Sequence, residues 1–321
     1  MGHAQLLRIG RTSFPFPRLR PIRALWLAVL ALPAVAAAQP RYSWELSGSD
    51  LSSNLSNFDS TAIGATYYFD RVEDGQAPYA LAAFFDPATL VSATLSHPSK
   101  STDTWTVSGR YLLSPSLWYV GGQFTRDANG VVDVDTDTYG VVAGKYLGPR
   151  TTLELAMDTS KNELTTAFSA GCSFPPCPFV SLTTRTKTET TSLSVFHVRQ
   201  FRSLTYVLTG GLRTRETHFT VIDNGSVPSL NLVGPESPTL RTYSVGTTLY
   251  PTKKLGVHVG YEDTFGGSFD SYADGTYSVG ARWFFRPKVA FEVSLSRTDF
   301  NDPLSLYNET RLRSFRVIGR F

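Results

Sequence analysis

Apolar and polar residues alternate in segment after segment of this chain. In the stretch 255–262, Leu255, Val257, Val259 and Tyr261 are separated by glycine, histidine and glycine residues. A period of two is typical of a β-strand with one apolar and one polar face, because successive side chains point to opposite sides. The same period recurs at 104–113, 151–158 and 288–298. The sequence therefore predicts strands whose glycine-rich and charged faces suit a water-filled interior.

Two kinds of connection separate these segments. The short ones combine a glycine, aromatic or leucine residues and a proline, which is typical of a strand that ends in a tight turn at a membrane interface. They lie at 109–115, 144–149, 246–251 and 280–287. Long polar stretches lie at 159–190 and 215–240. Such alternation is typical of an outer-membrane β-barrel, with short turns in the periplasm and long loops outside.

The pattern predicts an all-β fold: a transmembrane antiparallel up-and-down β-barrel of about 14 strands, with about 12 or 16 as open alternatives. The expected strands cover residues 42–49, 60–69, 88–97, 104–113, 117–125, 137–147, 151–158, 188–199, 204–214, 240–250, 254–263, 275–286, 288–298 and 310–321. The strand at 188–199 is the least regular, because Phe196 and Val198 are out of phase with Leu193 and Val195. A soluble β-sandwich also alternates, but sandwiches seldom place long polar loops at one end only.

The last strand ends on an aromatic residue. Alternation places Phe315, Val317 and Phe321 on its lipid-facing side, and Arg316 and Arg320 on its inner side. In the first strand the alternating apolar positions are Tyr42, Trp44 and Leu46. We expect Phe321 to close the barrel against this strand, because closure leaves no unpaired strand edge in contact with lipid.

The first 38 residues have the features of a secretory signal peptide. A basic region without acids precedes the apolar run Ala24–Leu32 and the small residues Ala36–Ala38. We expect a signal peptide over 1–38 and a single barrel domain over 39–321. Removing five of the 30 basic residues leaves 25 against 27 acidic ones, a net charge of −2, so we expect no nucleic acid partner. In the mature chain the longest apolar run, Tyr79–Phe85, is too short for a membrane-spanning helix.

Few residues suggest metal or catalytic chemistry. Cys172 and Cys177 lie in a proline-rich stretch and predict a local disulfide in an exported chain, whereas a metal site there lacks partner ligands. The alternating acids of 133–137 lack the glycine and the closing acid of a calcium loop. His97 and Ser99 have the spacing of a base and a nucleophile, but the intervening proline interrupts the strand. We expect no metal, no cofactor and no catalytic residue.

Two neighbouring stretches carry a family resemblance. Gly64–Asp70 (GATYYFD) and Pro78–Asp86 (PYALAAFFD) resemble the putative general bacterial porin family, in which a Tyr-Tyr-Phe strand end precedes a segment like Pro-Leu-Ala-Glu-Ala-Ala-Phe-Leu. Leu81 stands where that family has an acidic residue, so a polar role of that residue is not carried over. The resemblance implies the outer membrane of a Gram-negative bacterium, with lipid and lipopolysaccharide as surroundings. It also implies that the C-terminal strand engages the barrel-assembly machinery, and it leaves a homo-oligomer open.

The predicted function is that of a porin, a passive diffusion channel for small hydrophilic solutes or ions, and not an enzyme. The expected pore-lining residues are Glu45, Arg110, Lys145, Glu154, Arg213, Glu262, Arg282, Glu292, Arg316 and Arg320. Six basic against four acidic residues predict a weak anion preference, although such charges can also simply pair across the lumen. A short helix within 79–85 is expected to cover the periplasmic rim, with a gating plug as the alternative. A plugged structural or surface-interaction barrel is the alternative function, and a lipid hydrolase is the third.

Overall fold

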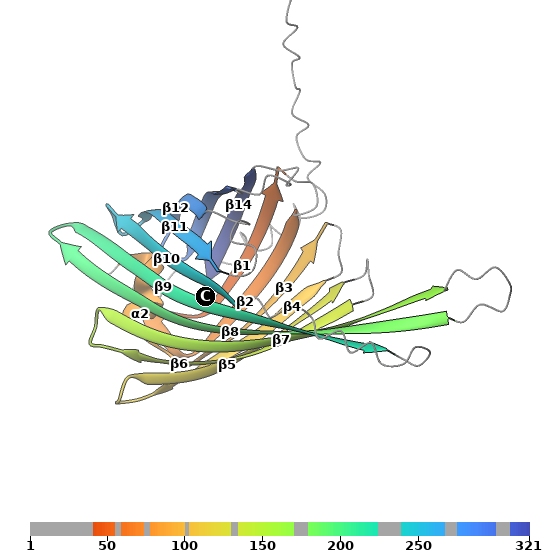
Figure 1. The fold of residues 1–321 in the computed structure, drawn as a ribbon. Helices are drawn as coiled ribbons and strands as arrows, with labels where there is room; N and C mark the ends of the chain where they lie inside the picture. The colour runs from red at the N-terminus through yellow and green to blue at the C-terminus, as the bar shows by residue number, and fades with distance from the viewer. Residues whose placement is uncertain are drawn as a thin grey trace, which may run out of the picture.

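The computed structural model describes residues 41–54, 59–73, 78–99, 103–129, 134–169, 179–223, 239–266, 275–299 and 309–321. In this part of the chain fourteen strands form one closed antiparallel barrel, in which sequence neighbours pair and β1 pairs with β14 (Figure 1). The strands are β1 (Arg41–Ser53), β2 (Ser60–Glu73), β3 (Leu90–Pro98), β4 (Thr104–Leu113), β5 (Trp118–Asn129), β6 (Val134–Tyr146), β7 (Thr151–Ser169), β8 (Phe179–Phe201), β9 (Leu204–Asp223), β10 (Thr239–Tyr250), β11 (Leu255–Phe265), β12 (Gly275–Arg286), β13 (Val289–Asp299) and β14 (Glu309–Arg320). The predicted fold class and strand number are confirmed.

The two ends of the barrel differ in their connections. At one end, called the turn end below, strands are joined by the short connections 114–117, 147–150, 202–203, 251–254 and 287–288. At the opposite end, called the loop end, the connections include longer stretches such as 224–238. Cys172, Cys177 and residues 1–38 lie outside the described residues, so the disulfide and the signal peptide stay predictions.

The barrel closes at the turn end through the main chain of its last residue. The Phe321 carbonyl accepts hydrogen bonds from the amides of Ser43 and Trp44, at 2.7 and 3.0 Å, and the Phe321 amide donates to the Trp44 carbonyl at 2.8 Å. Two consecutive amides on one carbonyl make a β-bulge, which shifts the alternation of the strand. The alternating face predicted for the first strand is therefore wrong at Tyr42, which is only 1% exposed and lies inside the barrel.

Large apolar side chains cover the outer face of the barrel, where they are exposed in the isolated chain. Near the loop end aromatic rings contact one another across adjacent strands. The contacts are Trp105 with Phe124 at 5.0 Å, Phe124 with Tyr139 at 4.9 Å, and Tyr261 with Tyr277 at 5.0 Å between ring centroids. An apolar outer surface with aromatic residues at its border is the surface that a bilayer solvates.

Three strands run much further than the sequence predicted. β7, β8 and β9 have 19, 23 and 20 residues, so most of the stretch 159–190 and the first part of 215–240, both expected as loops, are strand. A strand of about 9–11 residues crosses a membrane, and in Figure 1 β7 and β8 extend well past their neighbours. The strand lengths were underpredicted because the added residues are mostly polar on both faces. Such residues show no alternation of apolar and polar positions, so the pattern could not mark them as strand. The many threonines among them still favour the extended backbone.

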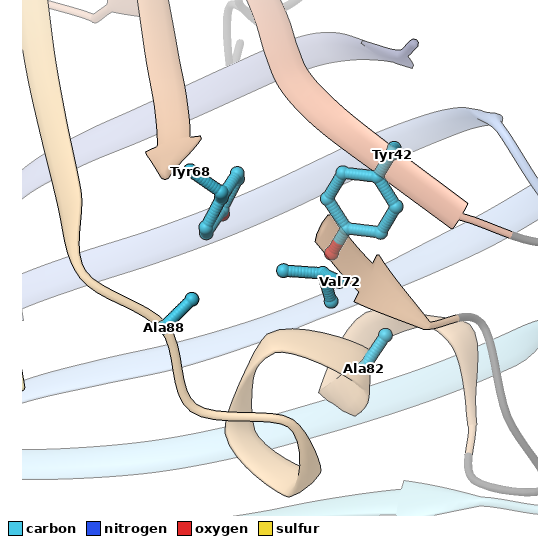
Figure 2. Close-up of a cluster of buried hydrophobic side chains, with 5 residues drawn as sticks. All are labelled: Tyr42, Tyr68, Val72, Ala82 and Ala88. Atoms are coloured by element: carbon cyan, nitrogen blue, oxygen red, sulfur yellow. The ribbon is translucent and has the colours of Figure 1, made fainter. Parts of the chain in front are cut away.

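A short helical segment follows β2. A single turn of 3-10 helix, η2 (Tyr79–Leu81), continues into the short helix α2 (Ala82–Phe85). Residues 78–86, called the inner segment below, lie inside the turn end of the barrel, where Ala82 packs against side chains from β1 and β2 (Figure 2). Among the described residues, no helix combines the length and apolar character needed to cross a membrane.

Candidate functional site

The inner face of the barrel toward the loop end is lined by small hydroxyl side chains. They hydrogen-bond in pairs across adjacent strands. The pairs are Ser92–Ser108 (2.6 Å), Thr106–Thr125 (2.9 Å), Thr242–Thr264 (3.0 Å), Thr276–Thr298 (2.8 Å) and Ser294–Ser314 (2.7 Å). Short side chains that satisfy one another along the wall leave the centre of the lumen to water. The inner wall is therefore polar in this part of the barrel.

Charged residues form a belt on the inner face closer to the turn end. Arg282 and Glu292 make an ion pair of 2.7 Å between β12 and β13. Arg316 on β14 donates to the Ser47 hydroxyl at 3.2 Å. The strand alternation also puts Arg213 and Glu262 on this inner face. Nine of the ten predicted pore-lining residues lie on the inner face; they are Glu45, Arg110, Glu154, Arg213, Glu262, Arg282, Glu292, Arg316 and Arg320.

The tenth predicted residue, Lys145, lies on the outer face. Its ammonium group is 5.0 Å from the ring centroid of Trp118, whose side chain is 45% exposed on the outside. Its neighbour Tyr146 is buried inside the barrel. The prediction was wrong because Val141 and Val142 are both apolar, so alternation leaves the phase of this strand ambiguous. Outside the barrel, Lys145 can extend along the aromatic surface and keep its charge in the headgroup region.

Two inner-face hydrogen bonds that the sequence reasoning missed join β5 to β7. The Tyr119 hydroxyl donates to Glu154 at 2.8 Å, and the Gln123 amide nitrogen donates to Asp158 at 2.6 Å. The Arg110 guanidinium lies 5.0 Å from the centroid of the Tyr119 ring. A signal was present in the sequence, because the donors and the acceptors are each four residues apart and so share one face of their strands.

The inner segment packs against strands on several sides of the barrel. Leu81, 5% exposed, lies among Val198 of β8, Val207 of β9 and Tyr250 of β10. These three strands lie far around the barrel from β2, which precedes the segment in the chain. The segment therefore crosses the inside of the turn end instead of only covering its rim, as the sequence analysis expected.

A second cluster holds the segment against the strands that it follows. Ala82 packs with Tyr42, Tyr68, Val72 and Ala88, all of which are buried (Figure 2). The Tyr42 and Tyr68 rings meet edge to face with centroids 5.5 Å apart. Both rings point inward, so the lumen here is filled by protein.

Contacts with the inner segment explain why the apolar residues of β8 do not keep to one face. Leu193 and Val195 are exposed on the outer face, whereas Val198 is buried inside. Phe196 points inward too, and its ring lies 4.6 Å from that of Phe84 in the inner segment. A strand that faces lipid in its middle and a packed interior at its turn end carries apolar residues on both faces, which breaks the expected alternation.

Arg320 ties the inner segment to the point where the barrel closes. Its side chain is 4% exposed, pairs with Glu45 at 3.0 Å and donates to the Tyr79 carbonyl at 2.6 Å. The guanidinium also lies between the rings of Tyr42 and Phe284, 4.7 and 5.1 Å from their centroids. A buried charge needs such partners, so the expected pore-lining residue Arg320 mainly joins β14, β1 and the inner segment.

A cavity remains beside the inner segment. It has a volume of about 540 Å³ and lies between Ala82 and Phe85 on one side and Arg150, Val198 and Thr205 on the other. These residues belong to the turn end, so the inner segment does not fill this end completely.

Two other groups of polar side chains have residue types that can bind a metal ion or transfer a proton. Glu189, Glu216 and His218 lie within ligand distance of one another on β8 and β9, but Lys187 pairs with Glu189. The hydrogen bond from this ammonium lowers the pKa of the Glu189 carboxyl. A lysine therefore already supplies the cation there. His97 at the loop end contacts Asp103 at 2.6 Å, and both side chains are exposed.

The comparisons with known proteins fit this geometry. Residues 21–171 match the family model described as putative general bacterial porin. These residues are therefore similar to a family of bacterial porins, and the chain forms a closed β-barrel of the outer-membrane type. The match runs through β1 to β7 and includes the inner segment, so it contains the two stretches on which the resemblance was based.

Solved structures support the fold. The outer membrane protein Omp33 of Acinetobacter baumannii is similar with a TM-score of 0.55 and 18% identity, over 88% of this chain and 99% of that one. A structure described as the CymD monoaromatic hydrocarbon channel has a TM-score of 0.52 and 11% identity, over 92% of each chain. No curated protein sequence matches the chain.

Proposed function

We propose that this β-barrel is a porin, a passive diffusion channel for small hydrophilic solutes and ions, with no chemical step. The observation that carries the proposal is the inner wall, where hydroxyl pairs line the loop half and charged residues line the belt below. A lumen built from such groups favours water and polar solutes over apolar ones.

The inner segment determines the size limit in this proposal. Its apolar contacts fill much of the turn end, and the cavity of about 540 Å³ beside it leaves space through which small solutes could pass. Solutes would leave the lumen along this side, past Arg150. We therefore expect a low conductance, with the rate of solute passage limited at the turn end.

The charges on the inner face favour little ion selectivity. Without Lys145 and with Asp158, the named inner residues comprise five basic and five acidic side chains. They are Arg110, Arg213, Arg282, Arg316, Arg320, Glu45, Glu154, Asp158, Glu262 and Glu292. Two of the basic residues are held in ion pairs, which further reduces their effect on passing ions. This balance replaces the anion preference expected from the sequence.

Single-channel recording of the refolded protein in a planar bilayer tests the proposal. We expect stable current steps and, under a salt gradient, a reversal potential close to zero. Arg110→Gln should shift the reversal potential toward cation selectivity, whereas Lys145→Gln, on the outer face, should leave it unchanged. Silent bilayers from protein shown to be folded would contradict the proposal.

A second candidate function has one specific observation in its favour. Because the inner segment contacts strands around the barrel, it is able to seal the turn end, which would make the protein a plugged barrel. The long β7, β8 and β9 would then serve as a surface for contact outside the membrane. Silence of the wild type, with current steps after deletion of residues 79–85, would favour this candidate.

A further inference from the structure

Three adjacent strands carry matched residues in two rows across the inner wall. In the first row, Tyr119 of β5 is opposite Gly144 of β6, which is opposite Glu154 of β7. In the second row, Gln123, Gly140 and Asp158 occupy the same strands in the same order. The rows are four residues apart on every strand, so all six positions lie on one face of the sheet.

The glycines of β6 make the rows possible. Hydrogen bonds from β5 to β7 must pass over the middle strand, and the bonds Tyr119–Glu154 and Gln123–Asp158 do so at 2.8 and 2.6 Å. A β-carbon at Gly144 would overlap the Tyr119 ring, and one at Gly140 would overlap the Asp158 carboxylate. A larger residue at either position would displace the side chain above it.

The hydrogen bonds fix two carboxylates without neutralising them. Each acceptor receives its bond from an uncharged group, a phenol or an amide, so these two hydrogen bonds bring no positive charge to the carboxylates. Both residues line a cavity of about 240 Å³, in which Arg110 is the only cationic lining residue. The lining therefore has a net charge of −1, with a fixed carboxylate at each row.

We propose that this wall is a binding subsite for small solutes that carry an ammonium group. An ammonium donates up to three hydrogen bonds, and a carboxylate that accepts one hydrogen bond can accept others from a solute in the cavity that both residues line. Fixed carboxylates bind better than mobile ones, because less side-chain freedom is lost on binding. The inference rests on the proposed function, since solutes must reach the lumen to meet the subsite.

Binding is tested without any measurement of transport. The probe is 1,4-diaminobutane, titrated into refolded protein in detergent and observed by saturation-transfer NMR, with 1,4-butanediol as the uncharged probe of the same length. We expect saturable transfer to the diamine and none to the diol. The double variant Glu154→Gln and Asp158→Asn keeps acceptor oxygens for Tyr119 and Gln123, so it should fold normally. Its apparent affinity for the diamine should be about tenfold weaker, because two charge pairs are lost.

The matched control is Glu262→Gln, which removes one acid from the inner face outside this cavity and should not change binding. Equal affinity of the double variant and the wild type, or no binding by the wild type, would overturn the subsite. Conductance separates this result from the proposed function. A channel that conducts salt but ignores the diamine overturns the subsite only, and a silent protein that binds the diamine overturns the channel only.

Discussion

The two halves of the barrel interior are built in different ways. Toward the turn end, inward side chains are large and buried, and the inner segment joins them into three apolar clusters. Toward the loop end, inward side chains include many serines and threonines paired by hydrogen bonds along the wall, together with charged residues such as Glu262. The same strands therefore contribute to a packed apolar core at the turn end and to a polar inner wall toward the loop end.

This difference separates stability from permeability. The turn half loses water on folding and contributes to stability as the core of a soluble domain does. The inward side chains of the loop half bury little apolar surface, so substituting them should change stability little. A larger side chain there would reduce the open cross-section of the lumen. Substitutions in the turn half should therefore mainly lower stability, and substitutions in the loop half should mainly lower conductance.

The largest effect is expected from Arg320→Gln in the turn half. It leaves the half-buried Glu45 without its buried partner and removes the bond to the Tyr79 carbonyl. Breaking a buried ion pair costs about 3–5 kcal/mol, so the urea midpoint of the refolded protein should fall strongly. The double variant Arg320→Gln and Glu45→Gln should recover part of this loss. If the single substitution Arg320→Gln left the urea midpoint almost unchanged, the Arg320–Glu45 pair would contribute no more than an exposed ion pair does.

Leu81→Ala is expected to come next. Leu81 is buried against three strands, and truncation of a buried leucine costs about 2–5 kcal/mol. The loosened inner segment should also raise the single-channel conductance. Leu95→Ala is the matched control, since Leu95 is 48% exposed on the outer face and should not affect conductance. Unchanged conductance in both variants would mean that the segment does not limit the passage.

Gly144→Val should have an intermediate effect. The new side chain would force the Tyr119 ring off the wall and break its hydrogen bond to Glu154, and overpacking of this kind costs about 1–3 kcal/mol. Gly109→Val is the control, because the nearest atom to its added β-carbon is 3.7 Å away. Urea titrations of both variants measure the difference, and equal midpoints would show that the row over Gly144 is not closely packed.

The smallest effect on stability is expected from Ser294→Trp in the loop half. Ser294 is half-buried, and the substitution removes its hydrogen bond to Ser314, a net loss of about 0.5–1.5 kcal/mol, but an indole in the lumen should lower the conductance clearly. Val293→Trp, on the outer face, should leave the conductance unchanged. A large loss of stability in Ser294→Trp would show that the loop half is packed like the turn half.

Much of the architecture was readable from the sequence, because it depends on local alternation. The limits of β4 and β12 agree with the prediction to the residue, and the strand number and closure of β1 on β14 were expected. The prediction of strand limits and faces was weakest where both faces are polar or where two apolar residues are adjacent. The extensions of β7, β8 and β9 are polar on both faces, and Lys145 was assigned to the wrong face where two valines are adjacent.

The sequence by itself determined which residues form strands and, for most strands, which face meets lipid, since a period of two is a property of neighbouring residues. Only the tertiary structure decided which residues meet across the barrel. The burial of Arg320, the inward turn of Tyr42 at a bulge and the two rows over Gly140 and Gly144 all depend on register between strands. Register is set by the closure of the whole sheet, so no single segment contains that information.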